Sequence, residues 1–241
     1  MLNLRKWTIK NYNQNKAVLE NIDLDFFENQ FTGIIALSGT GKTTLLNSIV
    51  FATNIIDGEL IFDDKKIDLK KNKKNWRKNI GIISQKNTLI NESSVFDNLK
   101  IFMSNRNNFF FKLFNIITKE QKIEIVQILE KINMLDKIYY LPKDLSGGES
   151  QKIQIAKLLI QKPKIVLADE PTSNLDNKNS EEILNLLKKF TSENNTITIV
   201  NIHNTNLLNI FDRIIGIKNK TIVLDKTNSK ITENDIKKVY E

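Results

Sequence analysis

The spacing of hydrophobic and polar residues near the N-terminus predicts β-structure. Residues 2–12 are rich in apolar side chains and end at Tyr12. Further on, Ile22, Leu24 and Phe26 alternate with polar neighbours. A period of two is typical of half-buried strands. We therefore expect the chain to open with an antiparallel sheet.

Short continuous apolar runs follow, and these are consistent with the buried strands of a parallel sheet. Such runs alternate with segments of helical character, which favours an α/β fold. Strands are expected at 33–37, 80–85, 164–170 and 196–202, with hairpins at 58–67 (turning at Asp63-Asp64) and at 213–218 with 221–225. Helices are expected at 44–50, about 70–78, 146–161, 179–190 and 232–240.

Residues 92–145 show the signals of helices, whereas the segments on either side contain short apolar runs typical of strands. Ser94 is placed to cap a helix, and Thr118 with Gln121 matches a capping box. Apolar residues at 125, 128, 129 and 132 then share one helical face. We interpret about 92–150 as a helical subdomain inserted into a single domain that spans 1–241.

Composition supports a globular fold and excludes some kinds of site. The chain has 241 residues, of which 40% are hydrophobic and 27% charged. Because there is no cysteine, disulfide frameworks and cysteine-based metal or nucleophile sites are excluded. No signal peptide is expected behind Met1, and no run approaches the roughly 20 apolar residues of a membrane span. The phenylalanine-rich stretch 109–114 is the nearest.

The formal net charge is +8 and the pI about 9.4. A basic excess can indicate binding to nucleic acid or to an anionic membrane surface. Lysine and asparagine are abundant throughout the chain, however, and do not cluster on one element. We therefore expect no nucleic-acid partner.

A glycine-containing loop lies between the strand predicted at 33–37 and the helix at 44–50. Its residues are Ala36, Leu37, Ser38, Gly39, Thr40, Gly41, Lys42, Thr43 and Thr44. They follow the phosphate-loop pattern GxxxxGK[ST], with Ala36 in place of the first glycine. The glycines let backbone N–H groups turn inward toward an anion. Lys42 is expected to reach the β- and γ-phosphates of ATP, and the Thr43 hydroxyl to hold Mg²⁺. The alternative is an ordinary glycine turn before a helix.

Several other short motifs follow in a fixed order. The segment Leu145-Ser146-Gly147-Gly148-Glu149 resembles the LSGGQ signature of the ABC ATPase family. Gln85 resembles the Q-loop residue, and Ile165 to Asp169 followed by Glu170 resembles the Walker B strand. Ser173 to Asp176 is similar to the D-loop, and His203, the single histidine, is similar to the H-loop residue. The resemblance spans essentially the whole chain and implies a P-loop ABC ATPase core with an antiparallel β subdomain and a helical subdomain.

The resemblance implies a role for each matched residue beside a plainer structural one. Asp169 and Gln85 would hold Mg²⁺ together with Thr43, and Glu170 would polarise the attacking water as general base. His203 would orient the γ-phosphate and the attacking water. A solvated acid pair, a strand-end amide and a loop histidine are the respective structural alternatives.

The resemblance also places Tyr12 under the adenine, although a strand tyrosine is often part of the core. The signature residues Ser146, Gly147, Gly148 and Glu149 would contact the ATP of a second copy of the chain. Ser146 and Glu149 also form the Ser-x-x-Glu capping box of a helix, and the two interpretations are compatible.

Two details narrow the branch of the family. Val200-Asn201-Ile202-His203 resembles the VNLH sequence of phosphonate-type importers, a group to which the mycoplasma high-affinity transport system is related. The stretch 109–114 also lies where that group has an extension. The resemblance implies an importer subunit at the cytoplasmic face of the membrane, docked on a permease and served indirectly by an extracellular solute-binding lipoprotein.

The cargo would be phosphonate-like or thiamine-like. The main rival is an ABC ATPase of a non-import envelope complex, of the lipoprotein-release or cell-division type. A ribosome- or nucleic-acid-acting ABC protein would usually carry two ATPase units or a long coiled coil, and the chain has neither.

Overall fold

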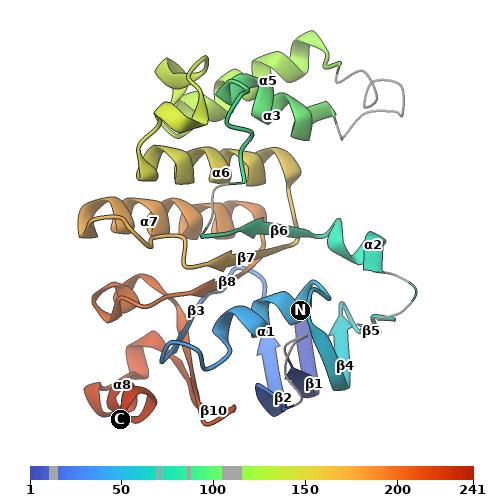
Figure 1. The fold of residues 1–241 in the computed structure, drawn as a ribbon, viewed down its shortest axis with the longest axis vertical. Helices are drawn as coiled ribbons and strands as arrows, with labels where there is room; N and C mark the ends of the chain where they lie inside the picture. The colour runs from blue at the N-terminus through green and yellow to red at the C-terminus, as the bar shows by residue number, and fades with distance from the viewer. Residues whose placement is uncertain (11–15, 69–70, 72, 86–87, 105–115) are drawn as a thin grey trace. The chain divides into compact units, whose positions relative to one another are not determined.

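The computed structural model describes residues 1–10, 16–68, 71, 73–85, 88–104 and 116–241 (Figure 1). The chain forms two compact units. The first unit comprises Met1–Ile82, Pro163–Pro171 and Lys188–Glu241, and the second comprises Ile83–Lys162 and Thr172–Leu187.

The first unit contains a six-stranded sheet whose inner strands are parallel. In order across the sheet, the strands are β10 (Thr221–Thr227), β9 (Arg213–Lys218), β3 (Phe31–Ala36), β8 (Ile197–Asn201), β7 (Ile165–Asp169) and β6 (Ile80–Ile83). Strand β3 pairs in parallel with β8 and β9, and β8 pairs in parallel with β7. Strands β9 and β10 form the expected antiparallel hairpin. The mostly parallel α/β core is therefore confirmed.

A second sheet in this unit is antiparallel, as the alternating pattern predicted. Its order is β2 (Leu19–Phe26), β1 (Leu2–Lys10), β4 (Asn54–Phe62) and β5 (Lys65–Lys66). Asp63 and Asp64 form the turn between β4 and β5, with φ of 49° and 60°. A two-residue hairpin turn of this type requires positive φ at both positions, and aspartate tolerates it better than most residues.

Helix α1 (Lys42–Ile49) contacts strands of both sheets and builds the core of the first unit. Figure 1 shows it beside β1 and β4. The buried Trp7 indole of β1 donates a hydrogen bond to the Ser48 hydroxyl of α1 at 2.8 Å. This contact pairs a polar N–H that would otherwise be buried without a partner. The phosphate-loop segment is thus held at both ends, by β3 before it and by the packed helix after it.

The remaining helices of the first unit are short. Helix α2 (Lys73–Arg77) is shorter than the predicted 70–78, and residues 69, 70 and 72 lie outside the described part of the chain. Two 3₁₀ helices, η3 (Thr205–Ile210) and η4 (Asn228–Lys230), precede helix α8 (Glu233–Tyr240). Helix α8 contacts β9 and β10.

The second unit is helical and has a core of its own. It contains α3 (Val95–Ser104), α5 (Lys119–Lys131), η1 (Leu135–Lys137), η2 (Pro142–Asp144) and α6 (Gly147–Gln161), together with the first part of α7 (Asn177–Asn194). The predicted capping box at Thr118 is present. Side chains such as Leu99, Leu129 and Ile153 form the buried cluster.

One predicted strand end differs from the structure, and two predictions about aromatic residues concern residues that the structure does not describe. Strand β6 ends at Ile83, so the prediction that it runs to Gln85 is wrong by two residues. Strand β1 is described as far as Lys10, and Tyr12 lies outside the described residues. The phenylalanines at 109–111 and 114 also lie outside them. Among the helices that the structure describes, none is long and apolar enough to cross a membrane.

Helix α8 begins with a capping box that predicts how stability depends on pH. Asp235 accepts hydrogen bonds from the Lys226 ammonium at 2.9 Å and from the Thr232 backbone N–H at 3.0 Å. These contacts lower the pKa of Asp235 to about 2 from its usual value near 3.8. A lowered folded-state pKa stabilises the fold above pH 3.8, and this contribution is lost as the pH falls toward 2.

We therefore expect Asp235→Asn to lower the urea midpoint of unfolding at neutral pH, because the charged contact to Lys226 is lost. The difference between variant and wild type should persist down to about pH 4 and shrink below it. Urea denaturation followed by circular dichroism at several pH values measures it. A difference that is constant down to pH 2.5 would contradict this linkage.

Candidate active site

The turn from β3 into α1 forms the floor of a polar cavity. Gly39 and Gly41 have φ of 79° and 113°, which non-glycine residues rarely adopt. A Cβ on Gly41 would also lie 2.6 Å from Val18 Cγ1, whereas a Cβ on Gly39 would meet nothing. Ala36, the departure from the family pattern, is the last residue of β3 and needs no positive φ.

The N-terminus of α1 is open toward this turn. Gly41 is the N-cap residue, and no described side chain caps it. The first-turn N–H groups of a helix have no intrahelical partners. Together with the helix dipole, they favour an anion at this position.

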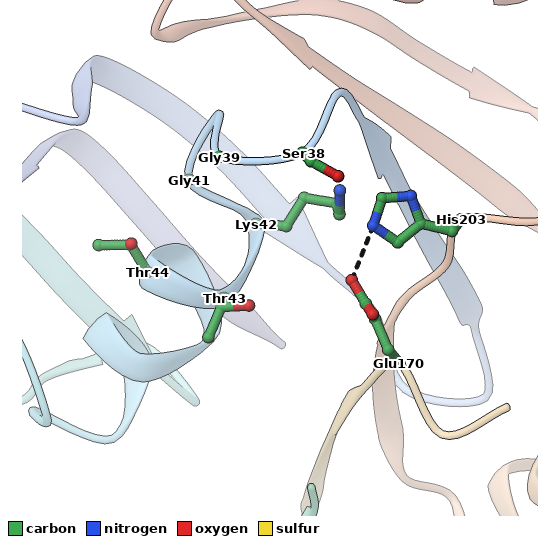
Figure 2. Close-up of a pocket in the computed structure, with 8 residues that line it drawn as sticks. All are labelled: Ser38, Gly39, Gly41, Lys42, Thr43, Thr44, Glu170 and His203. Carbon is green, nitrogen blue, oxygen red and sulfur yellow. Dashed lines mark ion pairs between the residues drawn. The ribbon is translucent and has the colours of Figure 1, made fainter. Parts of the chain in front are cut away.

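The cavity has a volume of about 200 Å³ and collects residues from three segments of the first unit (Figure 2). It is lined by Ser38, Gly39, Gly41, Lys42, Thr43, Thr44, Glu170 and His203. Thr40 is in the same turn, where its hydroxyl donates to the Leu37 carbonyl at 2.8 Å. The loop predicted from sequence therefore faces two of the predicted catalytic residues.

Lys42 is buried, and its ammonium donates to the carbonyl of Ala36 at 2.8 Å. Burial lowers the pKa of Lys42, while the carboxylates of Glu170 and Asp169 act in the opposite direction. The side chain is directed into the cavity in Figure 2. An anion bound there would offer this cation a stronger partner than a neutral carbonyl.

Thr43 and Asp169 provide adjacent oxygen atoms. The Thr43 hydroxyl donates to Asp169 Oδ1 at 3.1 Å, although the two residues are far apart in sequence. A hydroxyl and a carboxylate are donors that Mg²⁺ accepts, with phosphate and water oxygens completing its coordination. The described residues contain no group of three or more His, Cys, Asp or Glu side chains that could hold a metal ion. This small donor set fits Mg²⁺ brought in with a phosphate ligand better than a metal held by protein ligands throughout.

Glu170 and His203 are in close contact across the cavity. His203 Nε2 lies 2.9 Å from Glu170 Oε1, as Figure 2 shows. Glu170 directly follows β7 and has φ of 51°, an unfavourable value for a residue with a Cβ. Its backbone N–H donates to the Asn201 carbonyl at 3.2 Å. The fold thus holds Glu170 in a strained conformation that directs its carboxylate toward the histidine.

The remaining predicted site residues belong to the second unit or lie outside the described chain. Gln85 follows β6 and is exposed. Ser146, Gly147, Gly148 and Glu149 begin α6. The proposed roles of these residues, and that of Tyr12, stay predictions.

The signature segment contains the capping box that its sequence predicted. The Ser146 hydroxyl accepts from the Glu149 backbone N–H at 3.2 Å, and the Ser146 N–H donates to the Glu149 carboxylate at 2.8 Å. The latter bond is the main reason that the pKa of Glu149 is lowered. The Glu149 carboxylate is therefore engaged by the helix cap.

Sequence reasoning missed one residue that contacts a predicted site side chain. Asn201 at the end of β8 donates from its side-chain amide to Asp169 Oδ1 at 2.6 Å. The available signal was an asparagine that ends a strand of β-branched residues, two residues before His203.

Comparisons with known proteins agree with the motif order. The family model described as ABC transporter matches residues 19–173. A probable ABC transporter ATP-binding protein of Mesomycoplasma hyorhinis is 37% identical, over 100% of this chain and 96% of the relative. A phosphonates import ATP-binding protein, PhnC, of Mesoplasma florum is 38% identical, over 93% of this chain and 94% of the relative.

Solved structures show the same fold. A dimeric ATP-binding cassette in a post-hydrolysis state, bound to ADP and Pi, is 28% identical with a TM-score of 0.78, covering 95% of this chain and 99% of that one. The cassette cbiO1 of Clostridium perfringens has a TM-score of 0.83 at 24% identity, covering 98% of this chain and 92% of that one.

The cavity geometry predicts the effect of removing its cation. Lys42→Ala should weaken ATP binding by about 1.5–3 kcal/mol, roughly 10- to 150-fold in affinity, because a charge-assisted contact to phosphate is lost. Hydrolysis should be nearly abolished while the fold is retained. Lys189→Ala, which removes an exposed lysine paired with Glu193, is the matched control. Equilibrium binding of a fluorescent ATP analogue measures the change, and wild-type affinity in Lys42→Ala would contradict the assignment.

Proposed function

Because the chain belongs to the ABC transporter family, whose members hydrolyse ATP, we propose that it is the nucleotide-binding subunit of an ABC importer. In this role it energises uptake of a small phosphonate-like or thiamine-like solute through a membrane permease. The proposal of ATP hydrolysis rests on one observation. In the same cavity, an open helix N-terminus, Lys42 and Thr43 face the Glu170–His203 pair.

Phosphate binding in this proposal begins with Lys42. Its ammonium leaves the Ala36 carbonyl and contacts the β- and γ-phosphates, while the N–H groups of the loop and of α1 surround them. Ser38, Thr40 and Thr44 flank the same backbone turn. Bound Mg²⁺ would neutralise phosphate charge in the transition state, and Thr43, Asp169 and Gln85 are the residues proposed to hold it.

Glu170 and His203 act on the water in this proposal. The Glu170 carboxylate accepts a proton as the water attacks the γ-phosphate. The contact from His203 fixes the direction of that carboxylate. The side chain of His203 is 45% exposed and that of Glu170 21%, so water reaches the pair without any rearrangement of the core.

Support for an importer comes from the names of similar proteins. Several relatives at 33–38% identity are phosphonates import ATP-binding proteins. The cbiO1 cassette is part of a transporter complex. We infer the same kind of assembly: a subunit on the cytoplasmic face of the membrane, docked on permease subunits, with an extracellular solute-binding lipoprotein acting indirectly.

The alternative is an ABC ATPase of a non-import envelope complex, such as one for lipoprotein release or cell division. It would use the same ATPase residues. The Val200-Asn201-Ile202-His203 sequence and the phosphonate-import relatives favour the importer.

Reconstitution with the cognate permease distinguishes the two. Proteoliposomes containing the complex and the solute-binding lipoprotein should accumulate radiolabelled methylphosphonate or thiamine when ATP is supplied. Glu170→Gln should abolish accumulation. Release of a lipoprotein from the membrane without accumulation of either solute would instead support the envelope complex.

The active assembly is proposed to contain two copies of the chain. A cassette of similar fold is dimeric with ADP and Pi. Each ATP would lie between Lys42 and Thr43 of one copy and Ser146 and Gly148 of the other. A two-fold interface of this kind has two equivalent sites, and its stability depends on the γ-phosphate.

This arrangement predicts that a variant with slow hydrolysis accumulates as a dimer. Glu170→Gln removes the base, which typically costs about 10²–10⁴ in rate, and should be dimeric in Mg-ATP but not in Mg-ADP. Adding Ser146→Arg should prevent the dimer by placing a bulky side chain against the partner's phosphate. Gel filtration with light scattering gives the masses. A dimer that is indifferent to nucleotide would rule out the composite site.

A further inference from the structure

Asn201 is a fully buried polar residue whose backbone contacts Glu170, one of the residues that line the cavity. It is the last residue of β8, and the preceding residues of that strand are also buried. Asparagine is unfavourable in strands compared with the β-branched residues that precede it. A buried amide at this position therefore needs a reason beyond strand formation.

The backbone of Asn201 joins the strands that carry the site. It lies in register with Ile34 of β3 on one side and with Asp169 of β7 on the other. Its carbonyl accepts from the Glu170 N–H at 3.2 Å. The next N–H, of Ile202, donates to the Ile34 carbonyl at 3.0 Å.

The side chain of Asn201 makes a single described hydrogen bond. Nδ2 donates to Asp169 Oδ1 at 2.6 Å. Oδ1 of the amide is buried and has no hydrogen-bond partner among the described residues. A buried acceptor without a hydrogen-bond partner is unfavourable, because it has given up its hydrogen bonds to water. The opposite amide orientation would place Oδ1 against a carboxylate oxygen, so the contact with Asp169 determines which way the amide points.

Asp169 is therefore held by two donors on the same oxygen. Oδ1 accepts from Asn201 and from the Thr43 hydroxyl at 3.1 Å. Both bonds leave Oδ2 without a described partner, so it is available to other ligands. The fixed carboxylate cannot rotate freely, because rotation would break two hydrogen bonds at once.

We infer that Asn201 is a positioning residue for Mg²⁺: it orients the Asp169 carboxylate beside the phosphate loop. Residues that orient the ligands of a metal typically contribute 10- to 100-fold to metal affinity. This inference rests on the proposed role of Asp169 toward Mg²⁺, and the experiment below separates the two.

The variant that tests it is Asn201→Leu, which has a similar shape but no donor. The affinity of a fluorescent, non-hydrolysable ATP analogue is measured with and without Mg²⁺. Without Mg²⁺ the variant should bind like wild type. The gain on adding Mg²⁺ should fall roughly 10-fold or more. Because Asn201 acts through Asp169, adding the change to Asp169→Asn should have little further effect in a double-mutant cycle.

A measurement of thermal stability distinguishes a positioning role of Asn201 from a purely structural one. Asn201→Leu removes the unpaired buried Oδ1, so its melting temperature should be close to that of wild type. Thr198→Val is the matched control, since it removes a buried hydrogen bond to Thr191 of 2.7 Å from the same strand without touching Asp169. It should lower the melting temperature and leave the Mg²⁺ gain unchanged.

Each outcome decides between the alternatives. A normal Mg²⁺ gain in a folded Asn201→Leu protein overturns the inference. If that variant does not fold, the shorter Asn201→Val takes its place, and failure of both to fold makes Asn201 structural and the inference wrong. If Asp169→Asn itself leaves the Mg²⁺ gain unchanged, the proposed metal role of Asp169 fails instead.

Discussion

The parallel pairing of β8 with β3 on one side and β7 on the other is the constraint on which the site depends. Parallel strands end at the same edge of the sheet, where the following loops meet. Ile34, Asn201 and Asp169 lie in register there, so the loop after β3, the acid after β7 and the histidine after β8 share one cavity. A shift of one residue in β7 would turn the Asp169 side chain to the opposite face of the sheet.

Several features of the cavity are locally unfavourable. Glu170 has a positive φ, Lys42 is a buried cation, and Asn201 Oδ1 is a buried acceptor without a described partner. Strained backbone conformations typically cost about 1–3 kcal/mol each. They persist because the surrounding sheet and α1 are tightly packed, with the buried Trp7–Ser48 contact among the interactions that fix the helix. The site is thus maintained by the first unit's core together with the hydrogen bonds within the site.

The two glycine-containing helix starts differ in a way that follows from their sequences. Helix α1 begins at Gly41 with no described side-chain cap, so its N–H groups remain available to an anion. Helix α6 begins at Ser146 with a complete capping box. The Glu149 carboxylate therefore accepts a hydrogen bond in the helix cap, and its lowered pKa keeps it ionised there. A neutral glutamine, as in the family signature, could form the same cap without adding charge.

The sequence alone determined the features that depend on residues close together in the chain. Alternation and apolar runs predicted the strands to within a few residues, and the Ser146 and Thr118 capping boxes formed as expected because each uses residues three positions apart. The ordered motifs identified the family and most of the proposed site. Only the tertiary structure showed the Lys42 contact with its own loop, the strained turn at Glu170 and the bond from Asn201 to Asp169. These depend on which strands become neighbours and in what register, and that is decided by packing of the whole sheet.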